Sequence, residues 1–146
     1  MVNKQTAILN QIKTYLETIE DINFVGFTPD FHKIGNNLPA TLIKGGNEEL
    51  LEDMQQNGIV WRVMQVSVFL FTNKYVSRIQ NAYDLQASIE DVILDDVSLN
   101  GTAECVKLLN VMVGDDDNFL NNQVAGTADN LSLRIINFEV QFKSAR

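Results

Sequence analysis

The chain has 146 residues, 45% of them hydrophobic and 21% charged, a globular composition that excludes a disordered chain and predicts one domain over residues 1–146. Its formal net charge of −8 argues against specific binding of nucleic acid through the phosphates. The single cysteine, Cys105, excludes a disulfide within the chain. No apolar run reaches the roughly 20 residues that span a bilayer, and no signal peptide is visible, so we expect a protein made in the cytoplasm without a membrane partner.

The negative charge is concentrated in one stretch of the sequence. One interpretation is that these charges only keep the protein soluble. The other is that they form a surface that lies near DNA without adhering to it. Between residues 84 and 129 the only base is Lys107, and the acids are Asp84, Glu90, Asp91, Asp95, Asp96, Glu104, Asp115, Asp116, Asp117 and Asp129.

The first part of the chain predicts one long helix followed by several short elements. Apolar residues spaced by three and four predict a helix over residues 4–20, with Asn3 as its N-cap. Residues 22–37, rich in Phe and Gly, are expected to hold a short strand and a packed loop. Residues 38–43 predict a strand, and residues 47–56 predict one or two helical turns on a long connection.

The segment Trp61–Phe71 predicts a strand that is apolar on both faces. A strand that is buried on one side needs one apolar face, so something must cover the second. One candidate is the connection over residues 44–58, which could fold back over that face with Leu50, Leu51 and Met54. One face carries Met64, Val66, Val68 and Leu70, and the other carries Trp61, Val63, Phe69 and Phe71.

The second part of the chain predicts one helix and two strands. An apolar stripe predicts a helix over residues 78–95, with Ser77 as its N-cap. A strand over residues 103–113 and a strand over residues 131–142 flank a connection over residues 114–130. The expected faces are Val106, Leu108 and Met112 against Cys105, Leu109, Val111 and Val113 in the first strand, and Ile136, Phe138, Val140 and Phe142 on one side of the second.

These elements together predict an α+β domain with two layers. Two helices are expected on one face of a mainly antiparallel four-stranded sheet, because each amphipathic element must bury its apolar side. The order of elements is helix, short strand, long loop, strand, helix, strand and strand.

Residues that could carry catalysis or hold a cofactor are sparse. The one histidine, His32, lies in a loop, and Cys105 lies among apolar residues of a strand, where cysteine behaves as a small hydrophobe. A Cys105–His32 pair stays open as a minor alternative. One His and one Cys cannot build a zinc site of these ligands, and the run at residues 115–118 lacks the spacing of an EF-hand. We therefore expect no catalytic residue, no metal and no cofactor, and a structural or interaction protein.

The order and spacing of several segments resemble phage tail terminator proteins, also called tail-completion proteins, over nearly the whole chain. The resemblance is carried by the N-terminal helix, "LPATLI" (38–43), "WRVMQVSVFLF" (61–71), "SRIQNAYDLQASIEDVIL" (77–94) and "LSLRIINFEVQF" (131–142). It implies an α+β fold whose subunits form a hexameric ring on the head-proximal end of the tail tube. Such a ring ends tube polymerisation and joins the neck, so the implied partners are further copies, a tail tube protein and a neck or head-completion protein. The implied location is the virion tail, after assembly in the host cytoplasm.

The resemblance also suggests roles for two groups of residues. A neighbouring subunit could cover the second apolar face, which makes Trp61, Val63, Phe69 and Phe71 a candidate subunit interface. A lumen that DNA slides through benefits from negative charge, and the connection over residues 114–130 is a candidate for docking on tube or neck. The candidate lumen or docking residues are Asp95, Asp96, Asp115, Asp116 and Asp117.

Other functions remain open at the level of the sequence. The nearest alternatives are another neck component, such as a head-completion or stopper protein, and a tube-forming or baseplate protein. An alternative of a different class is a small ligand-binding or hydrolytic α+β domain, which predicts a concave pocket with convergent polar groups.

Overall fold

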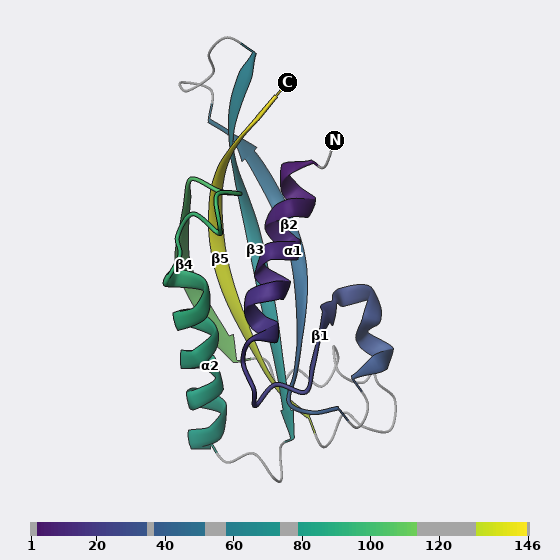
Figure 1. The fold of residues 1–146 in the computed structure, drawn as a ribbon. Coiled ribbons are helices and arrows are strands. Elements are labelled where there is room, and N and C mark those ends of the chain that lie inside the picture. The colour runs from purple at the N-terminus through teal and green to yellow at the C-terminus, as the bar shows by residue number, and fades with distance from the viewer. Residues whose placement is uncertain (1–2, 35–36, 52–57, 74–78, 114–130, 146) are drawn as a thin grey trace.

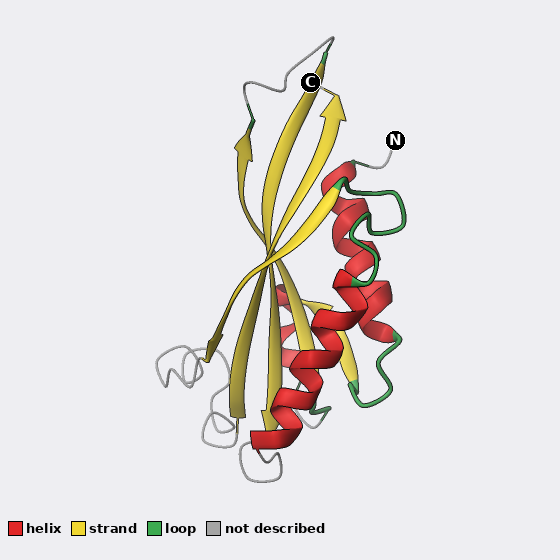
Figure 2. Ribbon diagram, turned by 90° about the vertical axis from the view of Figure 1, so that its left-hand side faces the viewer, coloured by secondary structure: helices red, strands yellow, loops and turns green. Residues whose placement is uncertain are grey.

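A computed structural model of the chain describes residues 3–34, 37–51, 58–73, 79–113 and 131–145 (Figure 1). The elements follow in the order α1 (Lys4–Glu17), β1 (Phe24–Phe27), η1 (Thr28–Lys33), β2 (Ala40–Leu50), β3 (Ile59–Asn73), α2 (Ile79–Leu94), β4 (Cys105–Val113) and β5 (Leu131–Ala145). The fold is α+β: both α-helices lie on one face of a single sheet, and η1 is a short 3-10 helix (Figure 2).

The sheet has five strands in the order β1-β2-β3-β5-β4. β1 pairs with β2 in parallel, and all other neighbours pair antiparallel. The short strand expected within residues 22–37 is confirmed as β1, but the predicted sheet of four strands with two helices is incomplete, because it leaves out β1 and η1. β1 has four residues inside an irregular aromatic segment, too few to show which strand it pairs with. Its place in the sheet is set by its pairing with Ala40–Ile43 of β2, which a local pattern does not reveal.

The two α-helices have the ends and the apolar stripes that the sequence predicts to within a few residues. The side chain of Asn3 accepts a hydrogen bond of 2.7 Å from the Thr6 backbone N–H, which confirms it as the N-cap of α1. α1 ends at Glu17 rather than at residue 20. Ser77, the predicted N-cap of α2, lies outside the described residues. The buried stripes are Ile8, Ile12 and Leu16 on α1 and Ala82, Leu85, Ile89 and Ile93 on α2.

The main core lies between these helices and the sheet. Side chains alternate along β3 and β5, so that every second residue faces the helices. The predicted inward faces of both strands are confirmed, because all of these side chains are buried in one cluster with the two helical stripes. They are Met64, Val66, Val68 and Leu70 on β3 and Ile136, Phe138, Val140 and Phe142 on β5.

β2 is longer than the sequence predicts. The predicted strand over residues 38–43 continues to Leu50, so the helical turns expected from residue 47 are wrong for residues 47–50, which are extended. Pairing with β3 satisfies the backbone groups on one side of this segment and overrides its weak helical pattern. Residue 51 has no regular structure, and the rest of that prediction, residues 52–56, lies outside the described residues. This end of β2, β3 and β5 projects beyond the helices, and Leu50 and Ile59 are exposed there (Figure 1).

β4 carries a β-bulge that corrects the predicted faces of this strand. Leu108 pairs with Phe138 of β5 and Asn110 pairs with Asn137, so Leu109 is an extra residue. Beyond the bulge the alternation is reversed. Val111 packs against the main core, although it was predicted to lie opposite Val106, and Met112 pairs with Ile135 on the other face. A bulge shifts the alternation by one position, and the sequence pattern around Leu109 does not reveal it.

Candidate assembly surface

Residues of η1 cover one end of the sheet face opposite the α-helices. Phe69 and Phe71 of β3 form a second buried cluster with Phe31 of η1 and with Ile34. The rings of Phe31 and Phe71 meet edge to face with their centroids 5.0 Å apart. The cover predicted from residues 44–58 is therefore wrong for its described part, because residues 44–50 lie in β2 and η1 takes that place. Two of the four candidate interface residues, Phe69 and Phe71, are thus occupied within their own subunit.

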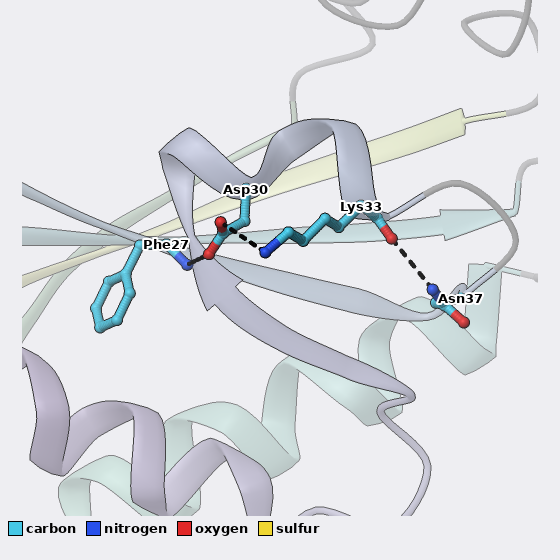
Figure 3. A network of polar contacts seen from close by, with 4 residues as sticks. All are labelled: Phe27, Asp30, Lys33 and Asn37. Atoms are coloured by element: carbon cyan, nitrogen blue, oxygen red, sulfur yellow. Dashed lines mark hydrogen bonds and ion pairs between the residues drawn. The ribbon is translucent and has the colours of Figure 1, made fainter.

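The segment that positions η1 is fixed by hydrogen bonds around Asp30 (Figure 3). The carboxylate of Asp30 accepts a hydrogen bond of 3.4 Å from the Phe27 backbone N–H and forms an ion pair of 3.4 Å with Lys33. The Phe27 N–H first, and Lys33 after it, lower the pKa of Asp30 below its ordinary value. Asn37 donates to the Lys33 carbonyl at 3.1 Å and ties the end of η1 to the start of the next segment. These contacts hold Phe31 over the sheet.

The other end of this face carries the two remaining candidate interface residues. Trp61 and Val63 are partly buried and lie beyond the cluster formed with η1. The ammonium group of Lys143 lies 4.6 Å from the centroid of the Trp61 ring and 3.6 Å from a carboxylate oxygen of Glu104. A cation over an aromatic ring is favourable and leaves the ring edge accessible. This end is therefore a mixed polar and apolar surface.

A small hollow of about 140 Å³ lies on this surface. It is flanked by the bulged residues of two strands, Asn47 of β2 and Leu109 of β4. The hollow extends along one face of the sheet, across the four strands from β2 to β4. Its other lining residues are Glu49, Val63, Gln65 and Glu139.

β4, at one edge of the sheet, exposes several large apolar side chains. The exposed fractions are 38% for Leu108, 42% for Leu109, 54% for Met112 and 62% for Val113. Natural edge strands usually carry charge or lie under a cover, because open backbone groups and apolar side chains promote association. β4 is therefore a second candidate for contact with another chain. Leu108 and Leu109 are visible in the sequence, but their position at a sheet edge follows only from the strand order.

The candidate acidic residues divide into three groups in the structure. Asp95 is exposed just after α2. Asp96 accepts hydrogen bonds from the Tyr15 hydroxyl at 2.7 Å, from the Ser98 hydroxyl at 2.7 Å and from the Asn100 backbone N–H at 2.7 Å. The Tyr15 hydroxyl, followed by these other donors, lowers the pKa of Asp96 to about 2. Asp115, Asp116 and Asp117 lie outside the described residues.

The open hollow beside Asp96 does not have the character of a ligand pocket. Its acidic residues are Asp91, Asp95 and Asp96, and the carboxylate of Asp96 is already engaged by the turn that follows α2. Ligand sites combine enclosure with polar groups that are free to converge on the ligand. Asp96 therefore acts chiefly as a link between α1 and the turn.

Arg134 is a buried charged residue that no motif in the sequence singles out. Its side chain is 9% exposed, its guanidinium lies 4.2 Å from the centroid of the Tyr83 ring, and it donates to Gln86 at 3.1 Å. Among the described residues no carboxylate pairs with it, and its Nε has no hydrogen-bond partner. Alternation from Ile136 places Arg134 on the inward face, which is the signal that could have identified it.

The structure does not bring the Cys105–His32 pair together. His32 is exposed on η1, next to Phe31, which contacts Phe71. Cys105 begins β4 at the level of Val63, eight residues from Phe71 along β3, a distance of about 26 Å at the rise of a strand. Within the described ranges no three or more His, Cys, Asp and Glu side chains form a group that could hold a metal ion.

None of the described helices is both long enough and apolar enough to cross a membrane.

Comparison with known proteins adds no relative. The chain matches no model of a protein family, and no curated protein matches it.

Proposed function

We propose that the chain is a structural virion protein of a tailed phage. In this proposal several copies, six by the resemblance, form a ring on the head-proximal end of the tail tube. The ring ends polymerisation of the tube protein and provides the surface that the neck or head-completion protein joins. The protein would be assembled in the host cytoplasm and remain in the virion, with no cofactor and no catalytic role.

The observation that carries the proposal is the unequal covering of the sheet. One face is buried by two α-helices, whereas the opposite face has a cover of η1 at the Phe71 end and leaves Trp61 and Val63 partly exposed. The same region ends in β4, where Leu109 and Met112 are exposed. Exposed and partly exposed apolar side chains on strands of one sheet favour contact with other chains. A subunit of a ring needs such surfaces on both of its sides.

The acidic charge has a role in the same proposal. Asp95 is exposed, and Asp96 keeps its negative charge at neutral pH because its pKa is about 2. We propose that these two residues, together with Asp115–Asp117, face the lumen or the axial surface of the ring. Negative charge there repels the phosphates of DNA and allows it to pass without adhering. Replacing Asp115–Asp117 by lysine is then expected to reduce infectivity by impairing tail completion or DNA passage.

Labelling of intact particles tests the proposed location. Gold-coupled antibodies against the chain are expected to mark one site per virion, at the junction of head and tail. Label along the whole tube would identify a tube-forming protein, and label at the distal end would identify a baseplate protein. Particles without label, prepared from a lysate that contains the protein, would contradict a role in the virion.

A further inference from the structure

We infer that the sheet continues from one copy of the chain to the next. In this arrangement the outer edge of β4 in one subunit pairs antiparallel with residues Lys44–Leu50 of β2 in its neighbour. The inference rests on the ring of the proposed function and names the contact that closes it. The two edges differ from each other, so the contact is head to tail, as a ring requires.

Besides the outer edge of the four-residue strand β1, two longer stretches of strand edge are open in the described part of the chain. β1 pairs with Ala40–Ile43 of β2, so the outer side of Lys44–Leu50 has no strand beside it there. β4 pairs with β5 on one side and ends the sheet on the other. Unpaired backbone groups along an edge are a template for another strand. The sheet therefore presents a long open stretch of strand on each side.

The register of the sheet places these two edges at the same level. Cys105 of β4 pairs with Gln141, which pairs with Val63, which pairs with Glu49 of β2. Subunits of a closed ring are related by rotation without a shift along the axis. An edge at one level in one copy therefore meets an edge at the same level in the next. At the other end of the contact, the corresponding row is Asn110, Asn137, Ser67 and Lys44.

The strand directions also fit this contact. Each of the three steps from β2 through β3 and β5 to β4 is antiparallel, so β4 runs opposite to β2 within one chain. Rotation about an axis roughly along the strands preserves their directions. β4 of one copy therefore meets β2 of the next as an antiparallel pair, which is the slightly more stable form of pairing.

The two bulges do not oppose the pairing. The bulge of β2 follows Gly45 and the bulge of β4 follows Leu108. Gly45 and Leu108 belong to one row, because Gly45 pairs with Val66, Val66 with Phe138, and Phe138 with Leu108. A bulged edge discourages a straight strand from pairing. Because the two strands run antiparallel, the bulges lie on opposite sides of this row, about one residue apart. Each edge has one extra residue between the two end rows of the contact, so Lys44–Glu49 can match Cys105–Asn110 residue for residue.

The side chains of the two edges are complementary. Lys107 of β4 and Glu49 of β2 are exposed on the face opposite the helices, and neither has an ion-pair partner among the described residues. In the proposed pairing they lie diagonally across from each other in neighbouring copies, within reach of a salt bridge. The exposed Leu109 would be partly covered by the neighbour. Opposite charges on edges that meet favour this partner over an unrelated strand.

Cross-linking between copies tests the contact. In a Cys105→Ser background, Lys107→Cys and Glu49→Cys are combined, and the purified protein is oxidised or treated with a thiol reagent shorter than about 10 Å. Within one chain these positions are three strand spacings apart, about 14 Å, so a short link joins separate copies. We expect a ladder of linked species on a denaturing gel, ending at the size of the closed ring. The matched control combines Lys107→Cys with Lys33→Cys on η1 and should remain monomeric on the gel.

The possible results of the cross-linking experiment distinguish a failure of the proposed contact from a failure of the proposed function. Rings seen by electron microscopy without a link between positions 107 and 49 would overturn the contact and leave the function standing. A protein that gives no ladder and no ring, either alone at high concentration or on added tail tubes, would contradict both. A ladder that does not end but grows into long polymers would overturn the closed ring while supporting the edge contact.

Charge exchange gives an independent measurement of the same contact. Lys107→Glu and Glu49→Lys are each expected to raise several-fold the concentration needed for assembly. A mixture of the two variants should recover assembly, because each altered edge then meets an edge of opposite charge in an alternating ring. Thermal unfolding of each variant checks that its monomer is folded, which matters because Lys107 also lies opposite Glu139 in its own chain. Failure of the mixture to recover would contradict the pairing.

Discussion

Tyr15 on α1 donates a hydrogen bond of 2.7 Å to the carboxylate of Asp96, which follows α2. The two residues are 81 positions apart in the chain. Asp96 also accepts hydrogen bonds from the backbone N–H groups of Ser98 and Asn100, so it organises the turn that leads to β4. This one carboxylate therefore fixes both the relative position of the two helices and the connection to the edge strand.

The Asp96 carboxylate predicts how stability depends on acid. Its pKa is lowered from 3.8 to about 2, so the folded state binds its proton less readily than the unfolded state does. The stabilisation by the ionised Asp96 carboxylate is complete above about pH 4 and is lost as the pH falls from about 4 to about 2. Asp96→Asn should reduce stability at pH 7 and flatten the fall between these values. Thermal unfolding from pH 7 to pH 2 measures this.

The matched control for this prediction is Asp95→Asn. Asp95 is the neighbouring exposed acid, and its replacement removes the same charge without removing the hydrogen bonds of Asp96, so it should flatten the fall less than Asp96→Asn does. An equal flattening in both variants would show that net charge, and not the hydrogen bonds of Asp96, sets the acid dependence.

The hydroxyl of Tyr15 predicts a second effect. The hydrogen bond to Asp96 raises the pKa of Tyr15 above its ordinary value of 10.0. Its contribution to stability is therefore present below pH 10 and is lost as the pH rises through the raised pKa. Tyr15→Phe should lower the melting temperature at pH 7 and make the alkaline limb shallower. In a double-mutant cycle with Asp96→Asn, purely additive effects would contradict the coupling.

Phe31 predicts how much the cover of η1 contributes to folding. Its side chain is 8% exposed and its ring packs on Phe71. Phe31→Ala should lower the free energy of unfolding by roughly 3 kcal/mol, because truncation of a buried aromatic side chain leaves a cavity. Phe31→Leu should cost clearly less. Urea denaturation measures both, and a loss well below 1 kcal/mol for Phe31→Ala would mean that η1 is not a firm cover.

Trp61 is expected to contribute more to assembly than to folding, in contrast to Phe31. Its ring is partly exposed and lies under Lys143 at the uncovered end of the same face. Trp61→Ala should have a smaller effect on unfolding than Phe31→Ala and a larger effect on oligomer formation. Sedimentation velocity over a range of concentrations compares the two variants. Unchanged assembly of Trp61→Ala would remove this end of the face from the subunit interface.

Elements with a periodic spacing of apolar residues could be predicted from the sequence. The stripe of Ile8, Ile12 and Leu16 identifies α1, and the alternation along β3 identifies its two faces. Features that depend on distant pairing could not be predicted. A short strand was expected within residues 22–37, but its parallel pairing with β2 was not, and the extended conformation of residues 47–50 depends on pairing with β3. The bulge at Leu109 reverses the faces of the rest of β4 without a local signal.

The candidate assembly surface could likewise be predicted only where a local sequence pattern indicates it. The apolar second face was visible from the alternation, but the sequence could not reveal that η1 covers Phe69 and Phe71 while Trp61 stays partly exposed. The edge position of β4 depends on the order of all five strands. The sequence indicated Asp96 only by its charge, whereas the structure shows that its carboxylate also holds the turn after α2.

The proposal that this chain ends the growth of a tail tube is tested by electron microscopy of a lysate from a phage that carries the gene with a stop codon at Trp61. The proposal predicts overlong or irregular tubes beside filled heads that have not joined a tail. Tails of normal length beside leaking heads would contradict termination and identify a neck protein instead, and intact virions of normal appearance would contradict a structural role altogether.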